Sequence, residues 1–183
     1  LVTATRQAYG KIDILVCNAA SNPYYGSMDG ISDDQFRKIM DNNILSNHWL
    51  MQMVLPEMRA RRDGAIIIVS SIGGLRGSPV IGAYNVSKAA DMQLVRNYAV
   101  ENGAHNIRVN AIAPSLTDTP LAKAITGNAA IAQGIAALHA IPRLGEADDI
   151  AAIGALLLSE KSGWITGQVI AVDGGRSRAR TKG

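Results

Sequence analysis

Short apolar runs alternate along the chain with longer stretches in which apolar residues recur at helical spacing. Four runs have the length of strands, and GAIIIVSS has the continuous β-branched character of a strand buried on both faces. The helical stretches between these runs favour βαβ units, in which right-handed crossovers join parallel strands. The strands are expected at residues 12–18, 64–71, 107–113 and 168–175.

The longest helical pattern covers residues 31–62. It opens at Ser32, a residue type that caps helix N-termini, with acidic residues in the first turn. Pro56 is expected to end or kink this helix, because proline has no amide hydrogen to donate. Further helices are expected over 82–102 and 146–160, and an irregular, Ala-rich region of short helices is expected over 114–140.

This order of elements predicts an open α/β sheet whose ligands bind beyond the carboxyl ends of the strands. The chain has 183 residues, of which 48% are hydrophobic, and this is enough for one compact domain with a real core. We expect that domain to span residues 1–175 and a basic C-terminal tail to follow at 176–183.

The net charge of +3 originates in that tail, which holds four basic residues, so the rest of the chain is close to neutral. A basic tail can contact nucleic acid or anionic lipid, but this one has no interleaved aromatic residues. A solvated terminus is the favoured interpretation. No apolar run reaches the ~18–20 residues that span a bilayer. We therefore expect neither a nucleic-acid partner nor a membrane partner.

The cysteine and histidine residues exclude two further kinds of site. Cys17 is the single cysteine, which rules out an internal disulfide and fits a reducing, cytoplasmic location. His48, His105 and His139 share no metal-ligand spacing with one another or with the cysteine, so no metal site is expected.

Tyr84 and Lys88 stand four positions apart in GAYNVSKAAD, near the start of an expected helix. Such pairs share one helix face, and many are only surface neighbours, so the spacing alone leaves their role open. A free tyrosine, with a pKa of about 10, is a poor acid–base catalyst near neutral pH, but a nearby ammonium group favours the phenolate. Ser71, at the end of the preceding strand, is expected to reach the same crevice.

These residues fall within six ordered motifs by which nearly the whole chain resembles the short-chain dehydrogenase/reductase family. The resemblance implies a Rossmann-like, doubly wound parallel sheet, NAD or NADP as the cofactor, and a homotetramer or dimer. The loop NAASNPYYG is most similar to bacterial members and to NADP-dependent carbonyl and retinal reductases. The six motifs are IDILVCNAA, MDNNIL, IIIVSSIGG, YNVSK, IRVNAIAPSLTDTP and ITGQVIAVDGG.

The resemblance also implies a reaction, in which hydride passes between nicotinamide and a secondary alcohol or ketone. Tyr84 would exchange a proton with the substrate oxygen, while Lys88 would lower the pKa of the tyrosine and bind the nicotinamide ribose. Ser71 would orient the substrate oxygen, and Asn43 (or its neighbour Asn42) would hold a water that links Lys88 to solvent. The residues implied to contact the cofactor are Asn18, Ala19, Tyr84, Lys88, Pro114, Thr117 and Thr119.

The chain departs from the family pattern mainly at its start. The glycine-rich turn that receives the cofactor's pyrophosphate has no counterpart, so we expect an N-terminally incomplete sheet with the first three strands absent. SIGGLRG is glycine-rich but is interpreted as a flexible rim beside Ser71. Ser115 replaces a family glycine and would strain its loop if that position needs φ > 0. A truncated, non-catalytic remnant that cannot hold the dinucleotide is therefore the alternative to an active enzyme.

Overall fold

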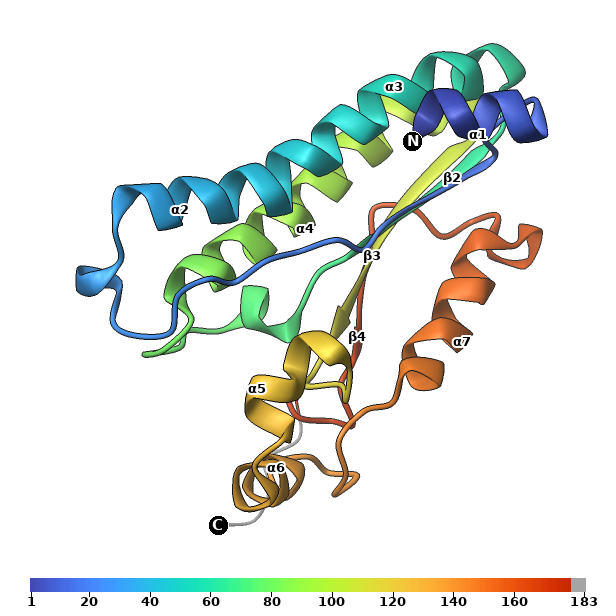
Figure 1. Cartoon of the computed structure of the whole chain (residues 1–183). Coiled ribbons are helices and arrows are strands. Elements are labelled where there is room, and N and C mark those ends of the chain that lie inside the picture. The colour runs from blue at the N-terminus through green and yellow to red at the C-terminus, as the bar shows by residue number, and fades with distance from the viewer. Residues whose placement is uncertain (179–183) are drawn as a thin grey trace.

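The computed structural model of the protein describes residues 1–178 and contains a four-stranded sheet in the order β1-β2-β3-β4 (Figure 1). All three strand pairings are parallel, with Leu15 beside Ile66 and Ile66 beside Val109. This topology confirms the predicted open α/β sheet with crossover connections. The strands are β1 (Ile14–Cys17), β2 (Gly64–Val69), β3 (Ile107–Pro114) and β4 (Val169–Val172).

Helices cover both faces of the sheet (Figure 1). On one face, α3 (Ser46–Arg61) packs against β1 and β2, and α4 (Gly82–Asn102) packs against β3. Beside α3 lies α1 (Val2–Tyr9), a helix that the apolar pattern did not predict. On the opposite face, α7 (Ala147–Leu158) packs against β2 and β3. This sandwich of helix, sheet and helix is the Rossmann-like layering that was expected.

Three shorter helices complete the arrangement. The first, α2 (Asp33–Met40), starts at a Ser32 capping box, as predicted, and leads toward α3 through a π-helical turn. Beyond the carboxyl end of β3 lie α5 (Lys123–Thr126) and α6 (Ala129–Ala136) (Figure 1). Within residues 1–178, no helix combines the length and the apolar character needed to cross a membrane.

The strand β2 sits at the centre of the core. Ile66 and Ile68 pack with Met51 and Val95 from the α3 and α4 side, whereas Ile67 packs with Leu157 of α7. Successive strand side chains point to opposite faces of a sheet, so a strand covered by helices on both sides must be apolar throughout. The prediction of a doubly buried strand is confirmed.

The burial of side chains explains how α3 continues past Pro56. Of the two outcomes expected at Pro56, an end or a kink, the end does not occur, because α3 continues to Arg61. An interior proline costs about 3 kcal/mol, but Leu55 and Met58 beside it are 2% and 0% exposed. Burial of two such side chains contributes roughly 1.5–3 kcal/mol each, which offsets that cost. At the edge of the sheet, Ile14 of β1 remains 48% exposed.

Candidate active site

The carboxyl ends of the strands open into a cleft of ≈ 790 Å³. Its position agrees with the expectation for ligand sites in open α/β sheets. Asn43 lies beneath the cleft with 0% exposure. Among the described residues, Ala20 lines the cleft and Ala19 does not, so the structure does not bring the Ala19 side chain to this site. The predicted site residues that do line it are Asn18, Ser71, Tyr84, Lys88, Pro114, Thr117 and Thr119.

Tyr84 enters the cleft from the first turn of α4, which begins at Gly82. Burial raises the pKa of Tyr84 to about 12, the neighbouring Ser71 hydroxyl opposes this shift, and the Asp91 carboxylate adds to it. Burial is the largest cause of this shift. The lowering of the tyrosine pKa that is expected from Lys88 stays a prediction.

Lys88 lies one turn beyond Tyr84 on the same helix face, with its Nζ atom 5.7 Å from the centre of the tyrosine ring. It is 2% exposed. Its ammonium group donates to the Val69 carbonyl at the end of β2 and to the Asp91 carboxylate, both over 3.0 Å. The importance of Asp91 was not evident in the sequence, where it is one polar residue in a mostly apolar part of the helix.

Ser71 is held at the end of β2 by the turn that follows it. Its Oγ atom accepts a hydrogen bond from the Gly73 amide over 3.0 Å, so its own hydroxyl hydrogen remains free to point into the cleft. The turn Ile72–Leu75 is a 3₁₀ helix packed on α4, and Ile72 and Gly73 are buried. The segment borders the cleft beside Ser71, as expected, and its first part is packed on α4.

Asn43 occupies the π-helical turn Asp41–Leu45 between α2 and α3. Single π turns often occur at functional sites, and this one brings the asparagine side chain into the interior. Its Oδ1 accepts from the Ser21 amide over 2.8 Å, and its Nδ2 donates to Ser87 Oγ over 3.0 Å. The Asn43 backbone carbonyl accepts from Asn47 Nδ2 over 2.7 Å. The side chain and carbonyl of Asn43 thus both have protein partners.

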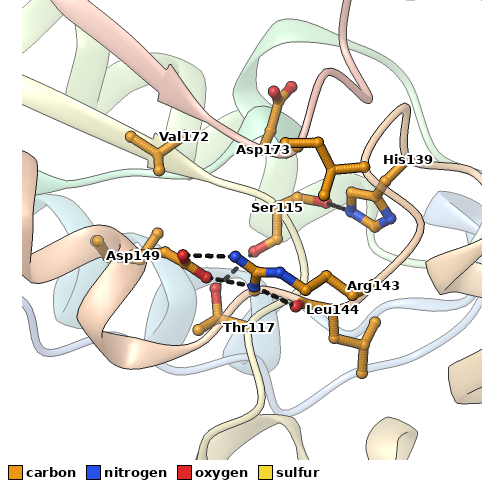
Figure 2. A pocket seen from close by; sticks show the side chains of 12 residues that line it. Ser115, Thr117, His139, Arg143, Leu144, Asp149, Val172 and Asp173 are labelled. Carbon is orange, nitrogen blue, oxygen red and sulfur yellow. Dashed lines mark hydrogen bonds and ion pairs between the residues drawn. The ribbon is translucent and has the colours of Figure 1, made fainter.

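A second, smaller cavity of ≈ 180 Å³ adjoins the cleft and is drawn in Figure 2. Ser115 does not have a positive φ, so the suspected loop strain is not present. Its Oγ instead lies 2.7 Å from Nε2 of the buried His139. Arg143 forms two hydrogen bonds with Asp149, over 2.6 and 2.7 Å, at the start of α7. Arg143 therefore holds the start of α7 in place.

Arg76 and Arg176 also line the cleft, a role that the sequence did not indicate. The turn after β4 places Arg176 there, because the Asp173 carboxylate accepts from the Gly175 and Ser177 amides over 2.9 and 2.8 Å. Burial lowers the pKa of Arg176, and the Arg76 charge lowers it further. Part of the expected basic tail thus packs on the cleft, and residues 179–183 lie outside the described part of the chain.

Known proteins share this fold and this sequence pattern. The family model described as enoyl-(acyl carrier protein) reductase matches residues 1–177. Dehydrogenase/reductase SDR family member 4 of Bos taurus is 38% identical over 175 residues, which are 96% of this chain and 63% of that protein. The chain therefore belongs to the short-chain dehydrogenase/reductase family of oxidoreductases, and it spans about 63% of the length of this relative.

Solved structures agree with this assignment. A short-chain dehydrogenase/reductase from Mycobacterium ulcerans superposes with a TM-score of 0.92 at 32% identity, covering 98% of this chain and 65% of that one. The structure of ElxO with NADP bound superposes with a TM-score of 0.89 at 32% identity, covering 96% of this chain and 71% of that one.

Proposed function

We propose that the chain carries the acid–base centre of an NAD(P)-dependent oxidoreductase that transfers hydride between nicotinamide and a secondary alcohol or ketone. One observation supports this most strongly. Tyr84, Ser71 and Lys88 come from a helix and the end of a strand, and all three line one cleft at the carboxyl ends of parallel strands. Family membership adds independent support, since the family consists of oxidoreductases.

The residues of the cleft suit a nicotinamide nucleoside. A volume of ≈ 790 Å³ lies within the usual ~300–1,000 Å³ of small-molecule sites. Asn18, Thr117 and Thr119 supply polar side chains along its wall, and Pro114 supplies an apolar one. Lys88 would reach the ribose with the N–H that Val69 and Asp91 leave available. When bound, the nicotinamide supplies or accepts the hydride.

Side chains of this protein would transfer the proton to and from the substrate oxygen. In the reducing direction, the Tyr84 hydroxyl donates its hydrogen to the substrate oxygen, and in the oxidising direction the phenolate takes it back. The Ser71 hydroxyl, oriented by the Gly73 amide, donates a hydrogen bond to the same oxygen. This bond strengthens as negative charge develops on the oxygen, so it stabilises the transition state.

The test is hydride transfer by the protein, followed through nicotinamide absorbance, with a panel of secondary alcohols and ketones. Tyr84→Phe is expected to lower kcat by roughly 10²–10⁴ fold, the usual contribution of a positioned acid or base. Tyr98→Phe is the matched control, because the Tyr98 hydroxyl contacts His48 over 2.6 Å and is absent from the residues that line the cleft. Unchanged kcat in a folded Tyr84→Phe variant would overturn the assignment.

We also propose that the protein assembles as a homo-oligomer, a tetramer or dimer, through α3 and α4. Leu45, Trp49 and Met53 recur every four residues and remain 36%, 49% and 49% exposed. On α4, Val86 and Val100 are 48% and 85% exposed. Apolar side chains that recur on neighbouring helices are typical of helix-mediated interfaces between subunits.

A further inference from the structure

A carboxylate is buried beside the lysine of the proposed active site. Asp91 lies on α4 three residues after Lys88, its side chain is 0% exposed, and its Oδ2 atom accepts from Lys88 Nζ over 3.0 Å. Lys88 also donates to the Val69 carbonyl over the same distance. Two of the three ammonium hydrogens are thus directed at the sheet and helix, which leaves one for the cleft.

A second helix fixes the position of this carboxylate. Asn47 of α3 is 2% exposed, and its Nδ2 donates to Asp91 Oδ1 over 3.0 Å and to the Asn43 carbonyl over 2.7 Å. Both amide hydrogens of Asn47 are therefore used, and both carboxylate oxygens of Asp91 are occupied. The result is a continuous buried chain of polar contacts from the π turn through Asn47 and Asp91 to Lys88.

Stability does not explain a buried ion pair at this point. Each ion loses several kcal/mol of hydration on burial, and well-packed apolar residues of similar volume are often as stabilising or more so. Met92 and Val95, which follow Asp91 on the same helix, show that apolar side chains can be buried in this part of the helix. A carboxylate that touches the lysine expected to act in catalysis therefore calls for a functional explanation.

Asp91 faces titratable groups from each element that surrounds it. Lys88 and Tyr84 lie on its own helix and Cys17 lies on β1, while Tyr25 acts on Tyr84 from the loop side of the cleft. Burial raises the pKa of Cys17 to about 12, so this thiol remains neutral near physiological pH. Asn47, the partner from α3, does not titrate. Lys88 and Asp91 are thus the charged members of this set of residues.

We propose that Asp91, held by Asn47, is a positioning residue that keeps Lys88 against the Val69 carbonyl and offsets the lysine charge. Tyr84 then gives up its proton at a higher pH than it would beside an unpaired ammonium group. The inference rests on the proposed function of Tyr84 as the acid–base group. It adds a residue that sets the ionisation of Tyr84, and neither family membership nor the tyrosine–lysine spacing indicates such a residue.

The experiment measures ionisation of Tyr84 directly, without cofactor or substrate. The protein is labelled at tyrosine Cζ with ¹³C, its NMR signals are followed against pH, and Tyr84→Phe identifies the signal of interest. Asp91→Asn is expected to lower the ionisation midpoint of Tyr84 by roughly one unit or more, since it removes the carboxylate that pairs with the Lys88 ammonium group and leaves the lysine charge to favour the phenolate. In a Lys88→Met background the same substitution is expected to change the midpoint by less than half as much, because there is no lysine charge left to offset.

Two outcomes would overturn the proposal. One is an unchanged Tyr84 midpoint in Asp91→Asn. The other is an equal shift in the Lys88→Met background, because the carboxylate would then act independently of the lysine. Asp34→Asn, at a side chain that is 96% exposed, is the matched control and is expected to leave the midpoint in place.

The wild-type protein gives a test that needs no Asp91 variant to fold. Its Tyr84 midpoint is expected near 12, and a value at or below the ordinary 10.0 would also refute the offset. None of these signals requires turnover. The hydride-transfer assay of Tyr84→Phe therefore tests the proposed function separately.

Discussion

The Asn43 amide donates a hydrogen bond to the Ser87 hydroxyl over 3.0 Å, which ties the π turn to α4 between Tyr84 and Lys88. The Ser87 hydroxyl in turn donates a hydrogen bond to the Tyr84 carbonyl over 2.7 Å. The same Asn43 side chain makes two hydrogen bonds with the Ser21 backbone after β1. One buried amide thus joins the π turn, the segment after β1 and α4.

Replacing Asn43 with alanine is expected to destabilise the protein by about 1–3 kcal/mol, because the buried Ser87 hydroxyl and the half-buried Ser21 backbone lose their partner. The measurement is the free energy of unfolding from urea titration. Asn42→Ala is the control, because Asn42 is exposed and its loss is expected to change stability by no more than about 0.5 kcal/mol. Equal losses in the two variants would contradict the assignment of the structural asparagine to position 43.

The sequence predicted the parts of the site that depend on local pattern. Tyr84 and Lys88 share a helix face because of their spacing, and Ser71 follows a strand whose apolar run is unambiguous. The role of Asp91 was not predictable, because it depends on Asn47, which is 44 residues away on another helix. At Pro56 the sequence left an end and a kink of the helix as alternatives for a similar reason, since the tertiary burial that carries α3 past the proline outweighs a local propensity.

Gly74→Ala tests the close packing of the turn after Ser71 on α4. A Cβ atom at Gly74 would lie 2.7 Å from the Lys88 carbonyl carbon and from the Ala89 amide nitrogen, both of them backbone atoms. Such overpacking is expected to cost about 1–3 kcal/mol of stability, measured by urea titration. A methyl group added at Gly77 would have no neighbour within 4 Å, so Gly77→Ala is the control and is expected to stay within about 0.5 kcal/mol of wild type. A neutral Gly74→Ala variant would show that the helix and the turn are not in firm contact.

Asp173 makes the closing turn sensitive to acid. Burial alone would raise its pKa, but hydrogen bonds from Ser177 and Gly175 outweigh this, so the pKa lies below its ordinary 3.8. A depressed pKa means that the carboxylate stabilises the fold above pH ~4 and that this contribution is lost as the pH falls through the folded-state value. Between about pH 5 and pH 2, the Tm of Asp173→Asn is therefore expected to fall less steeply than that of wild type. Parallel Tm curves would contradict this; Asp34→Asn, at an exposed carboxylate, is the control.

Val100 provides the sharpest test of the proposed assembly through α3 and α4. Its side chain is 85% exposed in the single chain, and a buried charge at a subunit contact is expected to prevent association. Val100→Lys is therefore expected to shift the molar mass from a dimer or tetramer toward a monomer, measured by light scattering after size-exclusion chromatography. Val80→Lys makes the same change at a loop residue that is 47% exposed, and it is expected to leave the assembly intact. A monomeric wild type, or an unaltered mass for Val100→Lys, would refute an interface on this face.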